Sequence, residues 1–470
     1  RPLCTRIAHR LFRAGDASRL MICYHARWLV PVTAPPIAEG TVAVDGERIA
    51  YVGSRAGAPP GEDADLGNVL LLPGLVNAHC HLELTAMRGF LEELDFGDWI
   101  LRLATAKRAV LTSLEMLRDS ARLGIAEGLR AGVTTYGDTC HSGAVVDALR
   151  DCGVRGIMYQ EVFGPDPAEC DTSMGELREQ VAAARALETP LVGVGISPHA
   201  PYTVSDALYQ AATRYALDER LPMALHIAEA EVESLLVEQG KGRFADGLRA
   251  RGISVGPRGR SPVALLDRLG VLDARPVLIH CVRLVDGDID RIARSGSAVA
   301  HCPTANAKLG HGIAPVRELL DAGIRVGIGS DSVASNNRMD LLEDARLAAL
   351  FQSARLARHD ALPTAAALRL VTLGGAEVLG LADRVGSLDV GKDADLAAFS
   401  LEAPHAVPVH QPEAAALYAL RGADATFVCV AGRVLVWNGA VTGGAADPEL
   451  PARVQGYADA LQEWLHAMHP

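Results

Sequence analysis

The sequence lacks three features that would tie the protein to a membrane, to a nucleic acid or to an oxidising compartment. No apolar run approaches the roughly 20 residues that a membrane-spanning helix needs. The nine cysteines are scattered and form no CxxC pair, and the net charge at pH 7 is -12. Unpaired cysteines are typical of a reducing compartment, and a negative chain does not attract nucleic acid or anionic lipid. We therefore expect a cytoplasmic protein whose partner is a small molecule.

The chain is long enough for one large catalytic domain and a smaller domain. It has 470 residues, of which 49% are hydrophobic, so that it can bury a large core. The first twenty residues, RPLCTRIAHRLFRAGDASRL, are rich in arginine and poor in acids, a composition shared by organelle-targeting peptides. Because Met21 opens the part that has the pattern of a folded protein, we expect residues 1–20 to be a disordered or non-native leader.

Short β-type runs separated by Gly and Asp turns lie near both ends of the chain. They fill residues 21–72, where they suggest a small antiparallel sheet, and they return in residues 385–445. The first group has too few apolar residues to fold alone. We therefore predict that both groups form one discontinuous β-sandwich domain, followed by a C-terminal helix in residues 446–470.

Between these groups, in residues 73–384, apolar strands alternate with helical segments. Such alternation predicts an α/β architecture, and eight strand–helix units predict a (β/α)8 TIM barrel with its site at the carboxyl ends of the strands. The first run, residues 69–76, is apolar without alternation, which is typical of a strand buried on both faces. The eight expected strands lie near residues 70–77, 133–138, 154–162, 191–197, 222–228, 276–281, 297–302 and 324–331.

Polar residues of a few types gather where these strands end. His79 and His81 end the first strand, and because residues two apart share a face, both imidazoles can point to one place. A single histidine at a strand end is more often a satisfied core residue, but five at strand ends are improbable by chance. The other members are His199 after the fourth strand, His226 and Glu229 at the end of the fifth, His280 at the sixth and Asp331 at the eighth.

Three imidazoles and one carboxylate in this set are suited to a divalent metal. Zinc takes such ligands, and a catalytic zinc keeps a position for water. We predict His79, His81, His226 and Asp331 as the ligands. Cysteines 80, 281 and 302 adjoin histidines, but neighbours on a strand point to opposite faces, which disfavours thiolate ligation. Two-metal barrels commonly bridge their ions with a carboxylated lysine after the fourth strand, and LVGVGISPHAPY has none, so we expect one divalent ion per chain, with zinc favoured.

Several segments together resemble the amidohydrolase superfamily, and more narrowly its mononuclear zinc deaminase and chlorohydrolase branch. The resemblance covers about residues 21–440 and implies that the four predicted ligands bind metal and that Glu229 and His280 are catalytic. The matching segments are the His79 and His81 pair, SPHAPYTVS, HIAEAEVE, HCV, VAHCPTANAKLGHGIAPV and GIGSDSVASNNRMDLLEDARLAAL.

The chemistry of that branch needs these residue types. Attack of an activated water on an amino-bearing aromatic carbon needs a base for the water proton and an acid for the adjacent ring nitrogen. Asp331 suits the first role and Glu229 the second, with Glu229 then carrying the proton to the departing ammonia, while His280 orients the attacking oxygen. The alternative for Glu229 is a carboxylate that only stabilises the start of a helix.

Further residues are predicted to contact the substrate. The resemblance makes His199 a contact for the ribose or the ring, although a loop histidine that caps the next helix is the alternative. Glu83, Trp99 and Asn306 are also expected to line the pocket, together with Glu229. Trp99 in DFGDWI is slightly better explained as a core anchor.

Functions of different classes remain open at this point. The leading hypothesis is deamination of a 6-aminopurine nucleoside: aminodeoxyfutalosine, methylthioadenosine, adenosine or S-adenosylhomocysteine. A chlorohydrolase, or a deaminase of triazine, pterin or guanine-type rings, is the alternative, and a metal-free binding protein is the third. HLEL, DFGDWI and GSDSVASN resemble deaminases of aminodeoxyfutalosine, and MYQEVFG lacks the Arg expected for S-adenosylhomocysteine. We also expect a homo-oligomer, either a dimer or a tetramer.

Overall fold

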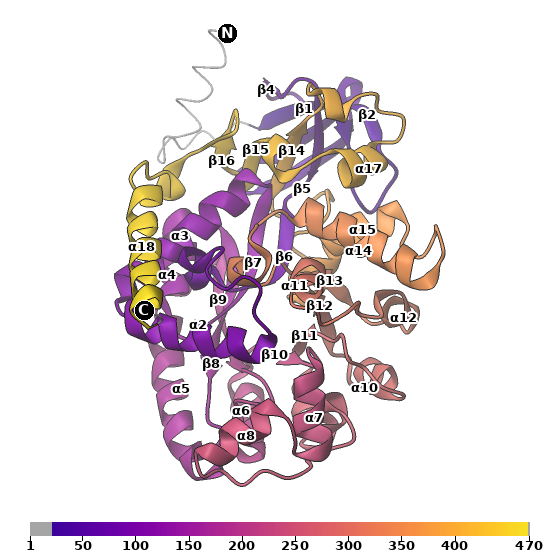
Figure 1. Cartoon of the computed structure of the whole chain (residues 1–470). Helices are drawn as coiled ribbons and strands as arrows, with labels where there is room; N and C mark the ends of the chain where they lie inside the picture. Colours follow the sequence, from indigo (N-terminus) through magenta and orange to yellow (C-terminus); the bar gives the residue numbers. More distant parts are fainter. Residues whose placement is uncertain (1–20, 469–470) are drawn as a thin grey trace.

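Eight parallel strands, β6 to β13, form two sheets that lie at the centre of the molecule (Figure 1). The structure is a computed structural model that describes residues 21–468, so the predicted leader lies outside the described residues. The strands belong to two four-stranded sheets, ordered β6-β7-β8-β9 and β10-β11-β12-β13. They are β6 (Leu75–Cys80), β7 (Val133–Cys140), β8 (Arg155–Val162), β9 (Val192–Pro198), β10 (Ala224–Ile227), β11 (Val277–His280), β12 (Ala298–His301) and β13 (Val326–Ile328).

The two parallel sheets meet at both edges. An isolated parallel bridge joins Ile196 of β9 to Met223, just before β10, and another joins Cys80 of β6 to Asp331, just after β13. Nearly every residue of the eight strands is buried. Strands that are buried on both faces have continuous apolar sequences, which is why the apolar runs indicated parallel strands.

The first of the eight strands differs from its prediction. The run that was expected to be one strand is divided between β5 (Val69–Pro73), which belongs to another sheet, and β6. Pro73 has no N–H to donate to a ladder, and a side chain at Gly74 would collide with Thr134, since a Cβ there would lie 2.3 Å from its Oγ1. The chain therefore passes from one sheet to the other at this pair of residues.

Strands from both chain ends form one nine-stranded sheet of mixed direction. Its order is β17-β16-β15-β14-β5-β1-β2-β3, with β4 paired to β1. The pairs of β1 with β4 and β5 are parallel, so the expected purely antiparallel sheet was wrong. The strands are β1 (Ile22–Leu29), β2 (Ile37–Asp45), β3 (Arg48–Ser54), β4 (Glu62–Asp65), β14 (Leu396–Ser400), β15 (Ala425–Val430), β16 (Arg433–Trp437) and β17 (Ala440–Val441).

This sheet curls so that its inner face closes on itself. Two strands separate β1 from β15, which in a flat sheet would place them about 14 Å apart. The ring centroids of Tyr24 on β1 and Phe427 on β15 are nevertheless only 4.9 Å apart. A single curled sheet thus encloses the small core for which a sandwich of two sheets was expected.

Helices cover the outside of the parallel strands (Figure 1). None of those between residues 21 and 468 is long and apolar enough to cross a membrane. The main helices are α2 (Phe96–Val110), α3 (Leu114–Arg130), α4 (Ala144–Cys152), α5 (Cys170–Arg185), α6 (Asp206–Glu219), α7 (Glu231–Gln239), α8 (Arg243–Ala250), α9 (Pro262–Arg268), α10 (Asp288–Ser295), α11 (Pro303–Lys308), α12 (Val316–Asp321), α13 (Val333–Asn336), α14 (Leu341–Leu356), α15 (Thr364–Leu370), α16 (Leu373–Val378), α17 (Pro412–Ala414) and α18 (Leu450–Met468).

The last helix, α18, packs against α2 and α3. Its buried residues Val454 and Leu461 belong to the same apolar cluster as Phe96 and Trp99 of α2. Arg453 also forms an ion pair with the buried carboxylate of Asp119 on α3, with Nε and Oδ2 2.9 Å apart. The predicted C-terminal helix is therefore present and supports α2 from outside.

A buried ion cluster ties the parallel strands to the nine-stranded sheet. Arg155, at the start of β8, binds Asp395 through two hydrogen bonds of 3.0 Å. Its Nη2 also lies 2.9 Å from Oδ2 of Asp393, and all three side chains are at most 2% exposed. Removing one partner of such a cluster leaves buried charge without compensation, which costs far more than the loss of a surface pair.

We expect Arg155→Ala to lower the free energy of unfolding by about 3–5 kcal/mol, because the carboxylate of Asp395 would stay buried without an ion-pair partner. Asp393 would keep its ion pairs with Arg48 and Arg384. Equilibrium urea denaturation followed by far-UV circular dichroism measures this. Arg317→Ala is the control, since Arg317 forms an exposed pair with Asp321, and it should behave like the parent. Equal stability of the two variants would show that the buried cluster does not hold the two sheets together.

Candidate metal and catalytic site

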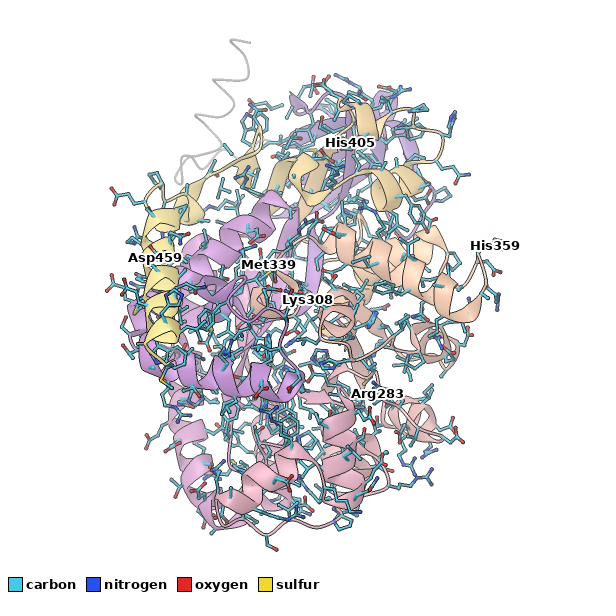
Figure 2. All side chains as sticks on the ribbon, in the orientation of Figure 1. Arg283, Lys308, Met339, His359, His405 and Asp459 are labelled. Atoms are coloured by element: carbon cyan, nitrogen blue, oxygen red, sulfur yellow. The ribbon has the colours of Figure 1, made fainter. Side chains whose placement is uncertain are left out.

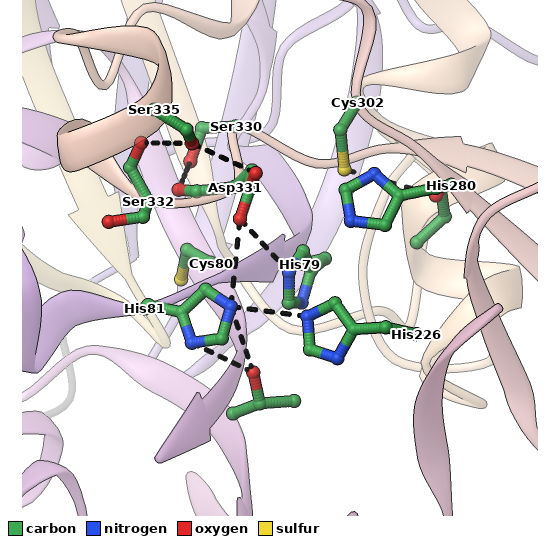
Figure 3. Close-up of polar contacts among 12 residues, drawn as sticks. His79, Cys80, His81, His226, His280, Cys302, Ser330, Asp331, Ser332 and Ser335 are labelled. Carbon is green, nitrogen blue, oxygen red and sulfur yellow. Dashed lines mark hydrogen bonds and ion pairs between the residues drawn. The ribbon is translucent and has the colours of Figure 1, made fainter. Parts of the chain in front are cut away.

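The structure brings the four predicted metal ligands together (Figure 3). His79 lies in β6 and His81 directly after it, His226 lies in β10, and Asp331 follows β13. The Nε2 atoms of His81 and His226 are 3.2 Å apart. Oδ1 of Asp331 lies 3.4 Å from Nε2 of His79 and 3.6 Å from Nε2 of His81. Residues distant in sequence thus point their ligand atoms at one place.

Hydrogen bonds turn the Nε2 atoms of two of these rings toward the cluster. Nδ1 of His81 lies 3.1 Å from the hydroxyl of Thr139. Nδ1 of His226 lies 3.3 Å from the backbone carbonyl of His199. A metal-binding histidine usually uses its other ring nitrogen in this way, which fixes the tautomer and the ring orientation.

The donor set fits a metal ion. Neither ring nitrogen of the buried His79 has a hydrogen-bond partner among the residues that the structure describes, a costly arrangement unless something binds there. Burial, reinforced by the neighbouring His79, lowers the pKa of His226 to about 3, so this imidazole is neutral and able to ligate. The ligand atoms of His79, His81 and His226 lie within 4.8 Å of one another.

Strained backbone marks the strand ends that carry the site. Asp331 has φ of 59° and His280 has φ of 78°, and Ala228, between His226 and Glu229, has φ of 51°. Residues other than glycine rarely adopt positive φ, and such strain persists only where the surrounding structure enforces it. The strand ends are therefore shaped to aim these side chains.

Glu229 and His280 form a second buried group beside the cluster. Nε2 of His280 lies 3.4 Å from Oε1 of Glu229, and Nδ1 of His280 lies 2.9 Å from Oδ1 of Asn306. The acids in the first turn of α7 are Glu231 and Glu233, and Glu229 precedes the N-cap residue Ala230. The carboxylate of Glu233 accepts hydrogen bonds from the backbone N–H groups of Ala228 and Glu229, at 2.9 and 2.8 Å. The carboxylate of Glu229 itself faces His280 and lines the cavity.

A cavity of about 830 Å³ opens onto these residues. His81, His226, Glu229, His280 and Asp331 all line it. Its volume suits a molecule of nucleoside size, since ligand pockets commonly measure about 300–1,000 Å³. The metal cluster and the Glu229 group therefore share one substrate-sized space.

Three of the four further residues that are predicted to contact the substrate line the cavity. Glu83, Trp99 and His199 line the cavity, and His199 does not cap the next helix, because Ser205 does. Trp99 also packs in the apolar cluster of α2, so it serves as core and as cavity wall. Asn306 is the exception: it does not line the cavity, and its side chain supports His280 from behind.

Glu83 is held in a polar group of its own. Its carboxylate binds Lys107 of α2 and the hydroxyl of Ser142. Burial raises the pKa of Glu83. Lys107 and the hydrogen bonds lower the pKa by more than burial raises it, so the pKa of Glu83 lies below its usual value. Lys107, which the sequence did not single out, thus keeps this buried carboxylate ionised.

Sequence reasoning also missed two residues near Glu229 and His199. Glu161, at the end of β8, is 6% exposed and lines the cavity, and burial raises its pKa to about 8. His311 lies in a loop and places Nε2 3.3 Å from Oε1 of Glu229. The search for polar residues at strand ends that identified the other acids could also have identified Glu161. It could not have identified His311, which does not lie at the end of a strand.

A family model supplies the deciding comparison. The model of the amidohydrolase family matches residues 70–435, which is most of the chain. The chain belongs to the amidohydrolase family. As an amidohydrolase with this histidine cluster, it is a metal-dependent hydrolase that acts on carbon–nitrogen bonds.

Individual relatives are similar to this chain over almost its whole length. The amidohydrolase is 33% identical over 421 residues to the 5-methylthioadenosine/S-adenosylhomocysteine deaminase of Moorella thermoacetica, covering 88% of this chain and 93% of that protein. A solved adenosine deaminase of Xanthomonas campestris with bound zinc has a TM-score of 0.84 at 30% identity, with 94% and 98% of the two chains covered. The atrazine chlorohydrolase of Arthrobacter aurescens, complexed with zinc, has a TM-score of 0.78 at 26% identity, covering 94% and 99%.

Proposed function

We propose that this amidohydrolase is a zinc-dependent aminohydrolase that converts a 6-aminopurine nucleoside to the 6-oxo product and ammonia. The observation that carries the proposal is the position of Glu229, an acid that is not in the ligand set, 3.4 Å from His280 in the cavity of the metal cluster. The likeness to the 5-methylthioadenosine/S-adenosylhomocysteine deaminase and to the zinc-bound adenosine deaminase supports it.

We infer that the eight parallel strands close into a (β/α)8 barrel made by residues 73–384. The bridges of Ile196 with Met223 and of Cys80 with Asp331 support closure, because they connect the two sheets at both edges. Residues 21–72 and 385–445 then form the small β domain. In a barrel of this kind the site lies at the carboxyl ends of the strands, which is where the cluster lies.

One metal ion per chain is proposed, held by His79, His81, His226 and Asp331. The fourth strand, β9, and the loop after it carry no lysine that could be carboxylated to bridge a second ion. When bound, a divalent ion of this kind lowers the pKa of water and so supplies a nucleophile at neutral pH.

The protein residues then handle the protons. Asp331 accepts the proton of the attacking water, and the hydroxyl of Ser335 holds it in place by donating a 2.9 Å hydrogen bond to Oδ2. Glu229 protonates the ring nitrogen next to the reacting carbon, takes up the proton released as the added hydroxyl becomes the carbonyl oxygen, and passes that proton to the departing amine. The proton held by Asp331 then returns to Glu229, so that water supplies both protons overall. His280, whose other nitrogen is held by Asn306, orients the attacking oxygen.

The chlorohydrolase alternative is favoured by one observation, the likeness to the zinc-containing atrazine chlorohydrolase. Displacing chloride, however, does not require a group that protonates an amine. The buried Glu229 therefore favours deamination, and release of ammonia distinguishes the two reactions. Triazine, pterin and guanine-type rings remain as substrates to be tested if no adenine nucleoside reacts.

The wall of the cavity at β8 bears on the choice among adenine nucleosides. Gln160 donates a hydrogen bond of 2.8 Å to the carbonyl of His141, and Glu161 presents a carboxyl group to the cavity. Neither provides the cation that would pair with the amino-acid carboxylate of S-adenosylhomocysteine. We therefore rank aminodeoxyfutalosine, methylthioadenosine and adenosine above S-adenosylhomocysteine.

The first prediction from this proposal concerns metal content. Elemental analysis of the purified protein should give one divalent ion per chain, mainly zinc, and His226→Ala should lose both metal and activity because a ligand is missing. Two ions per chain, or full activity without metal, would contradict the four-ligand assignment.

Glu229→Gln should keep its metal, because Glu229 is not a ligand, and lose most of its turnover. A positioned acid–base group contributes about 100- to 10,000-fold to the rate. Steady-state kinetics and metal analysis of the same preparation measure both properties. Near-parental turnover in this variant would remove Glu229 from the proton route.

The substrate ranking is tested with a panel of the four nucleosides, monitored by the absorbance change from adenine to hypoxanthine. S-adenosylhomocysteine should have the lowest kcat/KM, because its carboxylate finds no cation at the β8 wall. A higher kcat/KM for S-adenosylhomocysteine than for the other three would refute the ranking, and failure of all four would move the search to the other heterocycles.

A further inference from the structure

Glu229 contacts a second imidazole that the proposed mechanism does not use. Nε2 of His311 lies 3.3 Å from Oε1 of Glu229, and Nε2 of His280 lies 3.4 Å from the same oxygen. The three side chains are at most 5% exposed. Because both imidazoles face Oε1, the other carboxylate oxygen, Oε2, is the one left for a substrate in the cavity.

The loop around His311 is shaped to bring its ring inward. His311 lies between α11 and α12, flanked by Gly310 with φ of 71° and Gly312 with φ of 107°, a conformation that favours glycine. Its backbone N–H donates a 2.8 Å hydrogen bond to the carbonyl of Asn306. Since the side chain of Asn306 contacts His280, one residue supports both imidazoles that contact Glu229.

The ring of His311 is also fixed on a second side. Phe96 of α2 meets it edge to face, with ring centroids 4.7 Å apart and planes at 85°. Phe96 lines the cavity, whereas His311 is not among the lining residues. The imidazole therefore lies behind the cavity wall, between Phe96 and the carboxylate, where it can act on the substrate only through Glu229.

We propose that His311 is a positioning residue for the deamination, which orients Glu229 so that Oε2 meets the ring nitrogen of the substrate. The proposal rests on the proton-transfer role given to Glu229 under the proposed function. A carboxylate at the end of a strained turn has rotational freedom that a contact from His280 alone does not remove. A second contact on the same oxygen defines the plane of the carboxylate, and misplacing a catalytic group by about 1 Å can cost about 100-fold in rate.

The test compares His311→Ala, His311→Gln and the control His359→Ala in the metal-loaded full-length enzyme. His359 lies exposed between α14 and α15, at the edge of the molecule (Figure 2), and does not line the cavity. His311→Ala should lower kcat by about 10- to 100-fold with little change in KM, and metal content should stay at the parental value. His311→Gln, whose amide can donate to Oε1, and imidazole added to His311→Ala should each restore part of kcat.

A double variant tests whether His311 acts through Glu229. If it does, adding His311→Ala to Glu229→Gln causes no further loss of kcat, because the positioned group is already disabled. Additive losses, an unchanged kcat in His311→Ala, or a change confined to KM would each overturn the proposal. The assay uses whichever heterocycle the parent deaminates fastest, so failure with adenine nucleosides would count against the proposed substrate and not against His311.

Discussion

The parallel direction of the eight central strands is the constraint on which the site depends. Because all of the strands run the same way, their carboxyl ends gather on one side of the molecule, and so do the residues that follow them. His81, His226 and Asp331 are far apart in the sequence and yet lie within one cluster. No local interaction among them could achieve this, since buried imidazoles and a buried carboxylate are costly to bring together. The folding energy of the apolar strands therefore assembles a group of side chains that a metal ion then stabilises.

Much of this arrangement could be predicted because the signals were local. Apolar runs indicated the positions of the parallel strands, except that the first run is divided between β5 and β6. Polar residues at the strand ends indicated the cluster. The absence of a lysine in and after β9 can likewise be seen from the sequence alone. What could not be predicted were features set by distant partners. The break at Pro73 and Gly74 depends on Thr134, and the mixed direction of the outer sheet depends on the pairing of β1 with β5.

The residues that support the cavity-lining side chains were the hardest to predict from the sequence. Asn306 was expected to contact substrate, but it supports His280. His311 was not singled out, because its role depends on the path of a loop between two short helices and on a carboxylate far away in the chain. Apolar periodicity carries no information about such contacts. Lys107 was not predicted for the same reason, because its contact with Glu83 joins two residues that are 24 positions apart in the sequence.

The packing of α18 on α2 has a consequence for how specificity is distributed along the chain. Helix α2 supplies Phe96, Trp99 and Lys107 to the cavity wall, and the apolar side of α18 presses on it from outside. Val454 and Leu461 do not line the cavity, but they belong to the same apolar cluster as Phe96 and Trp99, which do. A substitution in this last helix is therefore expected to act on the width of the pocket through packing, while the metal cluster and the residues beside it stay unchanged.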